Sequence, residues 1–149
     1  MKKFINIADI NKNDLRIILD NAKIRKEKRS SLNKNIVDVD VPLDGKILIM
    51  IFEKPSTRTR ISFDIAVKQL GGKSLILNPD EIHYGTGNES LYDTAKILSQ
   101  YADIVMLRTH EHKNIEKFSK YLDVPLINGL TNLSHPCQIM SDIMTFEEL

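Results

Sequence analysis

Short apolar runs alternate along this chain with longer stretches in which apolar residues recur every three or four positions. The short runs are almost wholly apolar, which is typical of strands buried on both faces of a parallel sheet. They predict strands over residues 46–52, 73–77, 103–107 and 124–127. The periodic stretches predict helices over residues 11–29, 56–70, 89–101 and 113–122, and a last helix after His135-Pro136.

Strands that alternate with helices on short loops predict an α/β fold. We expect one domain over residues 1–149, with three α/β/α layers around a central, mainly parallel sheet of about four strands. Ligands of such sheets collect at the carboxyl ends of the strands. The loops after Phe52, Leu107 and Ile127 leave that edge, so their polar residues can converge on one pocket.

Two segments carry weaker patterns. Between residues 36 and 42, valines alternate with aspartates, which indicates either a short edge strand or an extended loop. Five cations lie near the end of the first helix, where they suit the helix dipole and are interpreted as a solvated helix end. These cations are Lys23, Arg25, Lys26, Lys28 and Arg29.

Composition narrows the functional class. Hydrophobic residues make up 42% and charged residues 28% of the chain, as in soluble globular proteins. The net charge of +1 gives no field of the size that nucleic-acid binding requires, and no apolar run reaches membrane-spanning length. A single cysteine, Cys137, and the absence of a signal-peptide pattern at the start favour a cytoplasmic protein.

The residues from Ser56 to Arg60 have the composition of an anion site. Pro55 marks a turn after the first buried strand, and Ser56 is a candidate N-cap for the helix that follows. A helix start offers unpaired backbone N–H groups and the positive end of the macrodipole. Arginines are unfavourable there unless an anion is bound, and a purely structural cap would carry Asp or Glu. The pattern therefore predicts a phosphate site.

Further polar residues follow the other strands. Arg108 comes directly at a strand end, and residues 128–138 contain His135 and Gln138 at the start of the last helix. His110 and His112 are two residues apart and do not share a helical face, so no metal site is predicted. No glycine-rich pyrophosphate turn is present, which counts against a nucleotide-binding domain. A small phosphorylated carbonyl compound fits these groups better.

Several of these segments, in this order, closely resemble the aspartate/ornithine carbamoyltransferase family. The resemblance covers nearly the whole chain and is carried by residues 52–60 (FEKPSTRTR), 89–95 (ESLYDTA), Arg108, 128–131 (NGLT) and 135–138 (HPCQ). Two long motifs at the correct spacing make it specific. It implies an enzyme that transfers the carbamoyl group of carbamoyl phosphate to an amine, without a metal or another cofactor.

The resemblance also implies roles for individual residues. Ser56, Thr57, Arg58 and Thr59 would hold the phosphate, and Arg108 would bridge phosphate and carbonyl oxygens. The carbonyl oxygen would be faced by Thr59, Arg108 and His135. Pro136 and Cys137 directly follow His135 and would belong to the same binding segment. Gln138 would recognise the carbamoyl amine. His83 would reach the phosphate of a neighbouring subunit in a homotrimer, although a solvated loop histidine is an equally good interpretation. Cys137 is interpreted as a small, partly buried residue rather than a nucleophile.

Features of the ornithine branch include Lys54, the tract 128–131 and Cys137, and they predict L-ornithine as the second substrate. No lysine occurs between Lys73 and Lys96, where the aspartate branch has one. Family members carry a second domain that binds the amine, and its motifs are absent, so we expect a domain cut from a longer enzyme that is inactive alone. A phosphate-binding module without turnover, and transfer to aspartate, acetylornithine or putrescine, remain as alternatives.

Overall fold

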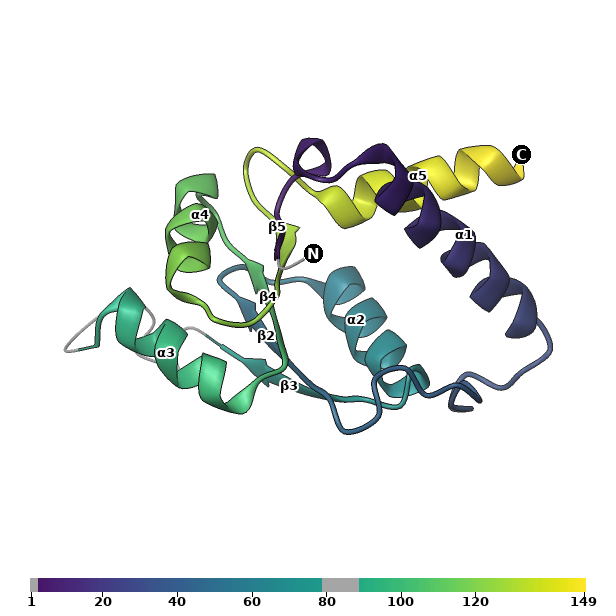
Figure 1. Cartoon of the computed structure of the whole chain (residues 1–149), viewed down its shortest axis with the longest axis horizontal. Coiled ribbons are helices and arrows are strands. Elements are labelled where there is room, and N and C mark those ends of the chain that lie inside the picture. The colour runs from purple at the N-terminus through teal and green to yellow at the C-terminus, as the bar shows by residue number, and fades with distance from the viewer. Residues whose placement is uncertain (1–2, 79–88) are drawn as a thin grey trace.

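The computed structural model describes residues 3–78 and 89–149, which form a five-stranded, all-parallel sheet with helices on both faces (Figure 1). The strand order is β1-β5-β4-β2-β3. The strands are β1 (Lys3–Phe4), β2 (Ile47–Phe52), β3 (Lys73–Leu77), β4 (Ile104–Arg108) and β5 (Leu126–Leu130). The helices are the 3-10 turn η1 (Ile7–Asp9), α1 (Lys12–Lys28), α2 (Thr57–Gln69), α3 (Leu91–Tyr101), α4 (His112–Tyr121) and α5 (Pro136–Glu148).

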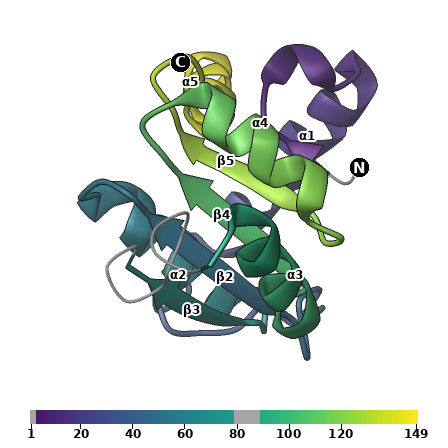
Figure 2. The same ribbon diagram turned by 90° about the vertical axis from the view of Figure 1, so that its left-hand side faces the viewer.

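Two apolar clusters hold the three layers together. Helices α3 and α4 cover one face of the sheet, and α2 and α5 lie on the other, with α1 against α5 (Figures 1 and 2). On the first face, the fully buried Ile115 and Phe118 of α4 pack in one cluster with Ile51 and Leu107 of the sheet. On the second face, Val67 of α2 packs with Met50 and Met106. Alternate residues of β2 and β4 thus point to opposite faces, which explains why these strands are apolar throughout.

The predicted three-layer α/β/α fold is confirmed, with two differences in detail. The sheet has five strands rather than about four, because Lys3 and Phe4 pair with Leu126 and Ile127 at its edge. A two-residue strand has no periodicity that a sequence pattern could reveal. Residues 29–46 form turns and no strand, so of the two interpretations the loop is correct. Over residues 3–78 and 89–149, no helix is long and apolar enough to cross a membrane.

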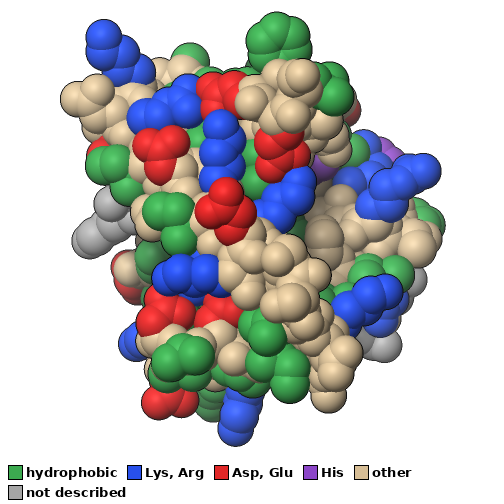
Figure 3. Space-filling model, turned by 90° about the vertical axis from the view of Figure 1, so that its right-hand side faces the viewer, with side chains coloured by type: hydrophobic (Ala, Val, Ile, Leu, Met, Phe, Trp, Pro, Cys, Tyr) green, Lys and Arg blue, Asp and Glu red, His purple; other side chains and the backbone are tan. Residues whose placement is uncertain are grey.

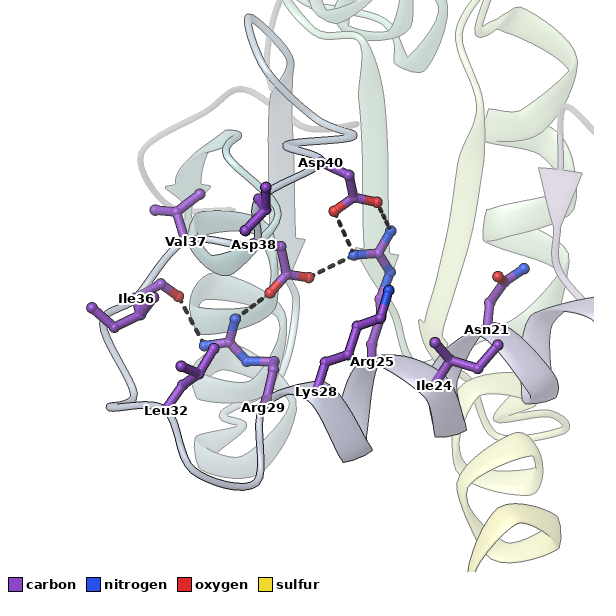
Figure 4. Close-up of a pocket in the computed structure, with 11 residues that line it drawn as sticks. Asn21, Ile24, Arg25, Lys28, Arg29, Leu32, Ile36, Val37, Asp38 and Asp40 are labelled. Atoms are coloured by element: carbon purple, nitrogen blue, oxygen red, sulfur yellow. Dashed lines mark hydrogen bonds and ion pairs between the residues drawn. The ribbon is translucent and has the colours of Figure 1, made fainter.

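The basic end of α1 is not simply solvated, which corrects the interpretation from sequence. Arg25 donates to the carboxylates of Asp38 and Asp40, each at 2.6 Å, and Arg29 donates to Asp38 and to the carbonyl of Ile36 (Figure 4). These contacts hold the loop beside a groove of about 610 Å³. The sequence pattern missed them because the partners lie 7 to 15 residues away, in a loop without regular periodicity.

Ion pairs also join the two helices that lie side by side at the outer end of the molecule. Glu147 of α5 accepts from Arg16 at 2.6 Å and from Lys23 at 2.7 Å, and Glu148 accepts from Lys26 at 2.5 Å. Figure 3 shows the resulting face, on which basic and acidic side chains alternate. Charges of both signs are interspersed there, so this face carries no single-sign patch that would attract a polyanion.

Candidate active site

The first turn of α2 presents its backbone N–H groups without a side-chain cap. Ser56 is the N-cap residue, as predicted, and has extended backbone angles (φ −155°, ψ 109°), but its hydroxyl makes no capping hydrogen bond. No acidic residue lies in the first turn of the helix. The positive end of the helix dipole is therefore not compensated by its own side chains, which suits a bound anion.

The start of α5 lies against the start of α2. His135 is the N-cap residue of α5, and Pro136, the first helical residue, is buried. Between the two helix starts is a cavity of about 150 Å³. It is lined by Arg58, Thr59, Ser62, Phe63, His135, Cys137, Gln138 and Ser141. The structure thus brings together side chains from two predicted motifs that are separated by more than seventy residues in the sequence.

Arg108 connects this cavity to the sheet. It is the last residue of β4, and its Nη1 donates to Thr59 Oγ1 at 3.2 Å and to the carbonyl of Gly129 at 3.4 Å. Its Nε atom is buried and has no hydrogen-bond partner among the described residues. Burial lowers the pKa of Arg108, yet an arginine stays charged at neutral pH. A partly buried cation with an unused, buried donor atom is costly unless an anion is bound, so this geometry favours a binding role.

The surroundings of His135 favour its neutral form. Burial lowers the pKa of its imidazole, and the positive charge of Arg108 lowers it further. Its Nδ1 atom is buried without a hydrogen-bond partner in the described part of the chain. A neutral imidazole donates from one ring nitrogen and accepts at the other, so His135 can give a ligand oxygen a hydrogen bond without adding a second positive charge next to Arg108.

Gln138 and Cys137 complete the wall of the cavity. The amide nitrogen of Gln138 donates to Asp142 Oδ1 at 2.8 Å, which leaves the amide oxygen of Gln138 as an acceptor for a ligand N–H group. Burial raises the pKa of the Cys137 thiol to about 11. A thiol that stays protonated at neutral pH is a poor nucleophile. Cys137 is thus a partly buried residue in the first turn of α5, without the character of a nucleophile.

Four of the predicted residues that the structure describes do not line this cavity, namely Ser56, Thr57, Arg108 and Pro136. Ser56 lines a separate cavity of about 380 Å³ together with Glu53, Lys54 and Arg60. Arg60, which the sequence pattern placed in the same cluster as Arg58, therefore faces a different side of the α2 start. The geometry of a helix explains this, since positions two apart project in different directions. His83 lies outside the described residues.

Sequence reasoning missed Glu53, which fixes the end of β4. The backbone N–H of Glu53 donates to the carbonyl of Arg108 at 2.9 Å. Its carboxylate accepts from the hydroxyl of Thr109 at 2.5 Å and from the backbone N–H of His110 at 3.1 Å. Glu53 thus ties the loop after β2 to the loop after β4. Two signals for it were present in the sequence, namely its position directly after a buried strand and its place in the motif of residues 52–60.

A β-bulge shapes the site where β4 meets β5. Leu107 pairs with Asn128, but Arg108 pairs with Leu130, so Gly129 is an extra residue in β5. Leu130 has a φ of 138°, which is strained for a residue with a side chain. Bulges bend a strand and redirect its side chains, and this one lies between Arg108 and the loop that carries His135.

Comparison with known proteins agrees with this arrangement. Residues 2–148 match the carbamoyl-phosphate-binding domain of aspartate/ornithine carbamoyltransferases. The chain belongs to this family. It is 47% identical over 148 residues to an ornithine carbamoyltransferase of Paracoccus denitrificans, covering 99% of the chain and 48% of that protein. The chain therefore spans about half the length of such carbamoyltransferases.

Solved carbamoyltransferase structures share the fold. The ornithine carbamoyltransferase of Pyrococcus furiosus superposes with a TM-score of 0.85 at 38% identity, over 99% of this chain and 45% of that one. A mutant N-acetyl-L-ornithine transcarbamylase, complexed with carbamyl phosphate and N-succinyl-L-norvaline, gives a TM-score of 0.85 at 27% identity, over 99% and 48% of the two chains. Carbamoyltransferases with different amine substrates thus use one architecture for this half of the protein.

Proposed function

We propose that this domain binds carbamoyl phosphate between the starts of α2 and α5, as half of an ornithine carbamoyltransferase. The observation that carries the proposal is the contact of Arg108 with Thr59 at 3.2 Å beside a cavity lined by Arg58, His135 and Gln138. The names of the relatives support ornithine as the acceptor. The amine side of the pocket belongs to the part of the relatives that this chain does not match.

The chemistry follows from where charge develops. The amine of L-ornithine attacks the carbamoyl carbon, a C–N bond forms, and the bond from that carbon to the bridging phosphate oxygen breaks. The products are L-citrulline and inorganic phosphate, and the amine loses a proton. Negative charge grows on the carbonyl oxygen, which Thr59, Arg108 and His135 stabilise by hydrogen bonds. Donors fixed in advance at that oxygen stabilise the transition state more than the ground state.

The phosphate binds at the start of α2, where Arg58 and Thr59 line the cavity and supply a guanidinium and a hydroxyl. Ser56 and Thr57 precede them in the chain and supply further N–H groups and hydroxyls at the same helix start. The departing phosphate carries more negative charge than the phosphate group that is still bonded to the carbamoyl carbon, so the same groups also stabilise the leaving group. Gln138 selects the carbamoyl group through its free amide oxygen, because Asp142 holds the amide nitrogen. Transfer to another amine would use these residues unchanged.

The intact enzyme in this proposal is a cytoplasmic homotrimer of arginine biosynthesis. The 149-residue chain by itself binds its ligand weakly and does not turn it over, since the amine side of the pocket is assigned to the half of the relatives that it does not match, and water has free access. Incubation with ornithine and carbamoyl phosphate tests this directly. Citrulline formation by the 149-residue chain alone would contradict the assignment of the amine site to the other half.

Arg58→Ala tests the phosphate site, and Arg60→Ala is its matched control. Both changes remove one positive charge from the start of α2, but only Arg58 lines the cavity with His135. Because a hydrogen bond to a charged group contributes roughly 1.5–3 kcal/mol, Arg58→Ala should weaken phosphate binding by about tenfold to a hundredfold. Arg60→Ala should change it by less than about threefold. NMR titration with inorganic phosphate measures both, and equal losses would remove Arg58 from the site.

Gln138→Ala separates the carbamoyl group from the phosphate. The variant should bind carbamoyl phosphate about tenfold more weakly, since one hydrogen bond to the amine is lost, and should bind inorganic phosphate as the parent does. Titration of each ligand into both proteins measures the difference. An equal loss for the two ligands would show that Gln138 contacts the phosphate or supports the fold instead.

A further inference from the structure

The loops that carry Arg108 and His135 are joined outside the cavity by a buried pair of side chains. His112 is the first residue of α4 and is 7% exposed, and Thr131 directly follows β5 and is 4% exposed. Imidazole Nδ1 of His112 lies 2.9 Å from Thr131 Oγ1. Neither residue lines the cavity between α2 and α5. Their role in the site must therefore be indirect.

Thr131 shapes the turn that leads to His135. Its Oγ1 atom accepts from the backbone N–H groups of Leu133 at 3.2 Å and Ser134 at 3.1 Å. The backbone N–H of Thr131 donates to the carbonyl of Ser134 at 3.0 Å. Ser134 immediately precedes His135, the N-cap residue of α5. One hydroxyl group thus fixes the chain direction as it enters the site.

The hydrogen-bond capacity of the hydroxyl indicates what His112 does. A threonine hydroxyl has one proton and two lone pairs, and the two backbone N–H groups occupy both lone pairs. The proton has two candidate acceptors, the carbonyl of Ser134 at 3.3 Å and Nδ1 of His112 at 2.9 Å. The shorter contact makes His112 the better acceptor. With Nδ1 as acceptor, the proton of a neutral His112 is on Nε2, which faces Glu116 at 3.8 Å.

The same two loops are joined a second time through Asn132. Its side-chain oxygen accepts from the backbone N–H of His112 at 3.1 Å, and its backbone N–H donates to the carbonyl of His110 at 2.9 Å. Arg108 lies two residues before His110, and His135 lies three residues after Asn132. The distance between these two site residues therefore depends on the joined loops.

We propose that His112 and Thr131 are positioning residues, which hold His135 at the carbamoyl end of the site by orienting one hydroxyl proton. This inference rests on the proposed function. The phosphate end depends on the start of α2, which makes none of these contacts. Loss of the His112–Thr131 contact should therefore affect recognition of the carbamoyl group and leave recognition of the phosphate intact.

Two pairs of variants of similar size test the inference. Thr131→Val removes the hydroxyl and His112→Leu removes the acceptor, and both roughly keep the volume of the side chain. Thr131→Ser retains the hydroxyl, and His112→Asn retains an acceptor. We expect Thr131→Val and His112→Leu to bind carbamoyl phosphate roughly tenfold more weakly, and inorganic phosphate within about twofold of the parent. Thr131→Ser and His112→Asn should bind both ligands as the parent does.

The outcomes separate this inference from the proposed function. Parent-like binding of carbamoyl phosphate by Thr131→Val and His112→Leu, or equal weakening of both ligands, would overturn the positioning role. If the parent chain binds neither ligand, the proposed function fails. The positioning role is then still tested by the imidazole resonances of His135 in ligand-free protein. These should shift in Thr131→Val and stay in place in Thr131→Ser, and unchanged resonances in both variants would refute it.

Discussion

Gly129 lies where β5 bulges against β4, and Gly129→Ala should disturb both the core and the site. A Cβ atom built at this position would lie 2.3 Å from the sulfur of Met106 and 3.4 Å from Cβ of Arg108. Nonbonded heavy atoms normally stay about 3.5–4.0 Å apart, so the sulfur would have to retreat by more than about 1 Å. Met106 is fully buried in the core on the α2 face, which leaves it little space to do so.

The expected cost can be stated from this geometry. Adding a methyl group to a well-packed core typically costs about 1–3 kcal/mol. For a domain of this size, that corresponds to a decrease of roughly 2–12 °C in Tm. The carbonyl of Gly129 also accepts from Arg108 Nη1 at 3.4 Å, so phosphate affinity should fall together with stability. Thermal and urea denaturation, with phosphate titration, measure both effects.

The same substitution in a Met106→Val variant tests whether the sulfur atom is the cause. In Met106→Val, which has no atom at the sulfur position, Gly129→Ala should cost much less than in the parent chain. Gly45→Ala is the control, because a Cβ there meets nothing within 4 Å and its cost comes from a φ of +68° alone. That cost should be the same in both backgrounds. If Gly129→Ala is equally destabilising with and without Met106, steric overlap with the sulfur is not the reason.

Two further predictions concern the charged groups. Asp38→Asn should destabilise the domain by about 1–3 kcal/mol, because its carboxylate is only 10% exposed and pairs with both Arg25 and Arg29. Asp40→Asn, at 61% exposure, should have little effect in the same urea denaturation, and equal losses would contradict the importance of burial. His135 should titrate by NMR below its ordinary pKa of about 6.5, because burial and Arg108 disfavour its charged form. Below a pH of about 6.5 the unfolded chain therefore binds more protons than the folded chain, so the free energy of unfolding should fall as the pH decreases. His135→Gln should reduce this pH dependence. If phosphate does not raise the pKa of His135, no anion binds near its imidazole.

The strands could be predicted from the sequence because burial on both faces gives uninterrupted apolar runs. β2 and β3 lie within one residue of the predicted bounds. The apolar run at residues 124–127 predicts a strand that starts two residues and ends three residues before β5 does, because Asn128 and Gly129 interrupt the pattern. Asn128 is nonetheless fully buried, and its amide donates to the carbonyl of Ile5 at 2.9 Å. A polar residue satisfied by such a distant partner cannot be recognised from local pattern.

The main residues of the candidate site were predictable for a related reason. Parallel strands direct their carboxyl ends to one edge, so residues after β2, β4 and β5 had to converge there. The particular contacts were not predictable. Arg58 and Arg60 look equivalent in sequence but line different cavities, and Glu53 was not distinguished from an ordinary loop residue. Such choices depend on side-chain directions, which the packed structure decides.

The pairing of β1 with β5 has a consequence for how the domain is made. The partners of Lys3 and Phe4 are Leu126 and Ile127, which leave the ribosome more than a hundred residues later. The carbonyl of Ile5 likewise receives its donor, the Asn128 amide, only then. β1 therefore cannot pair with the sheet during the early part of synthesis, and its backbone stays unpaired until β5 has been made. Closing so long a loop is slow, so assembly of the edge next to His135 should be a late step in folding.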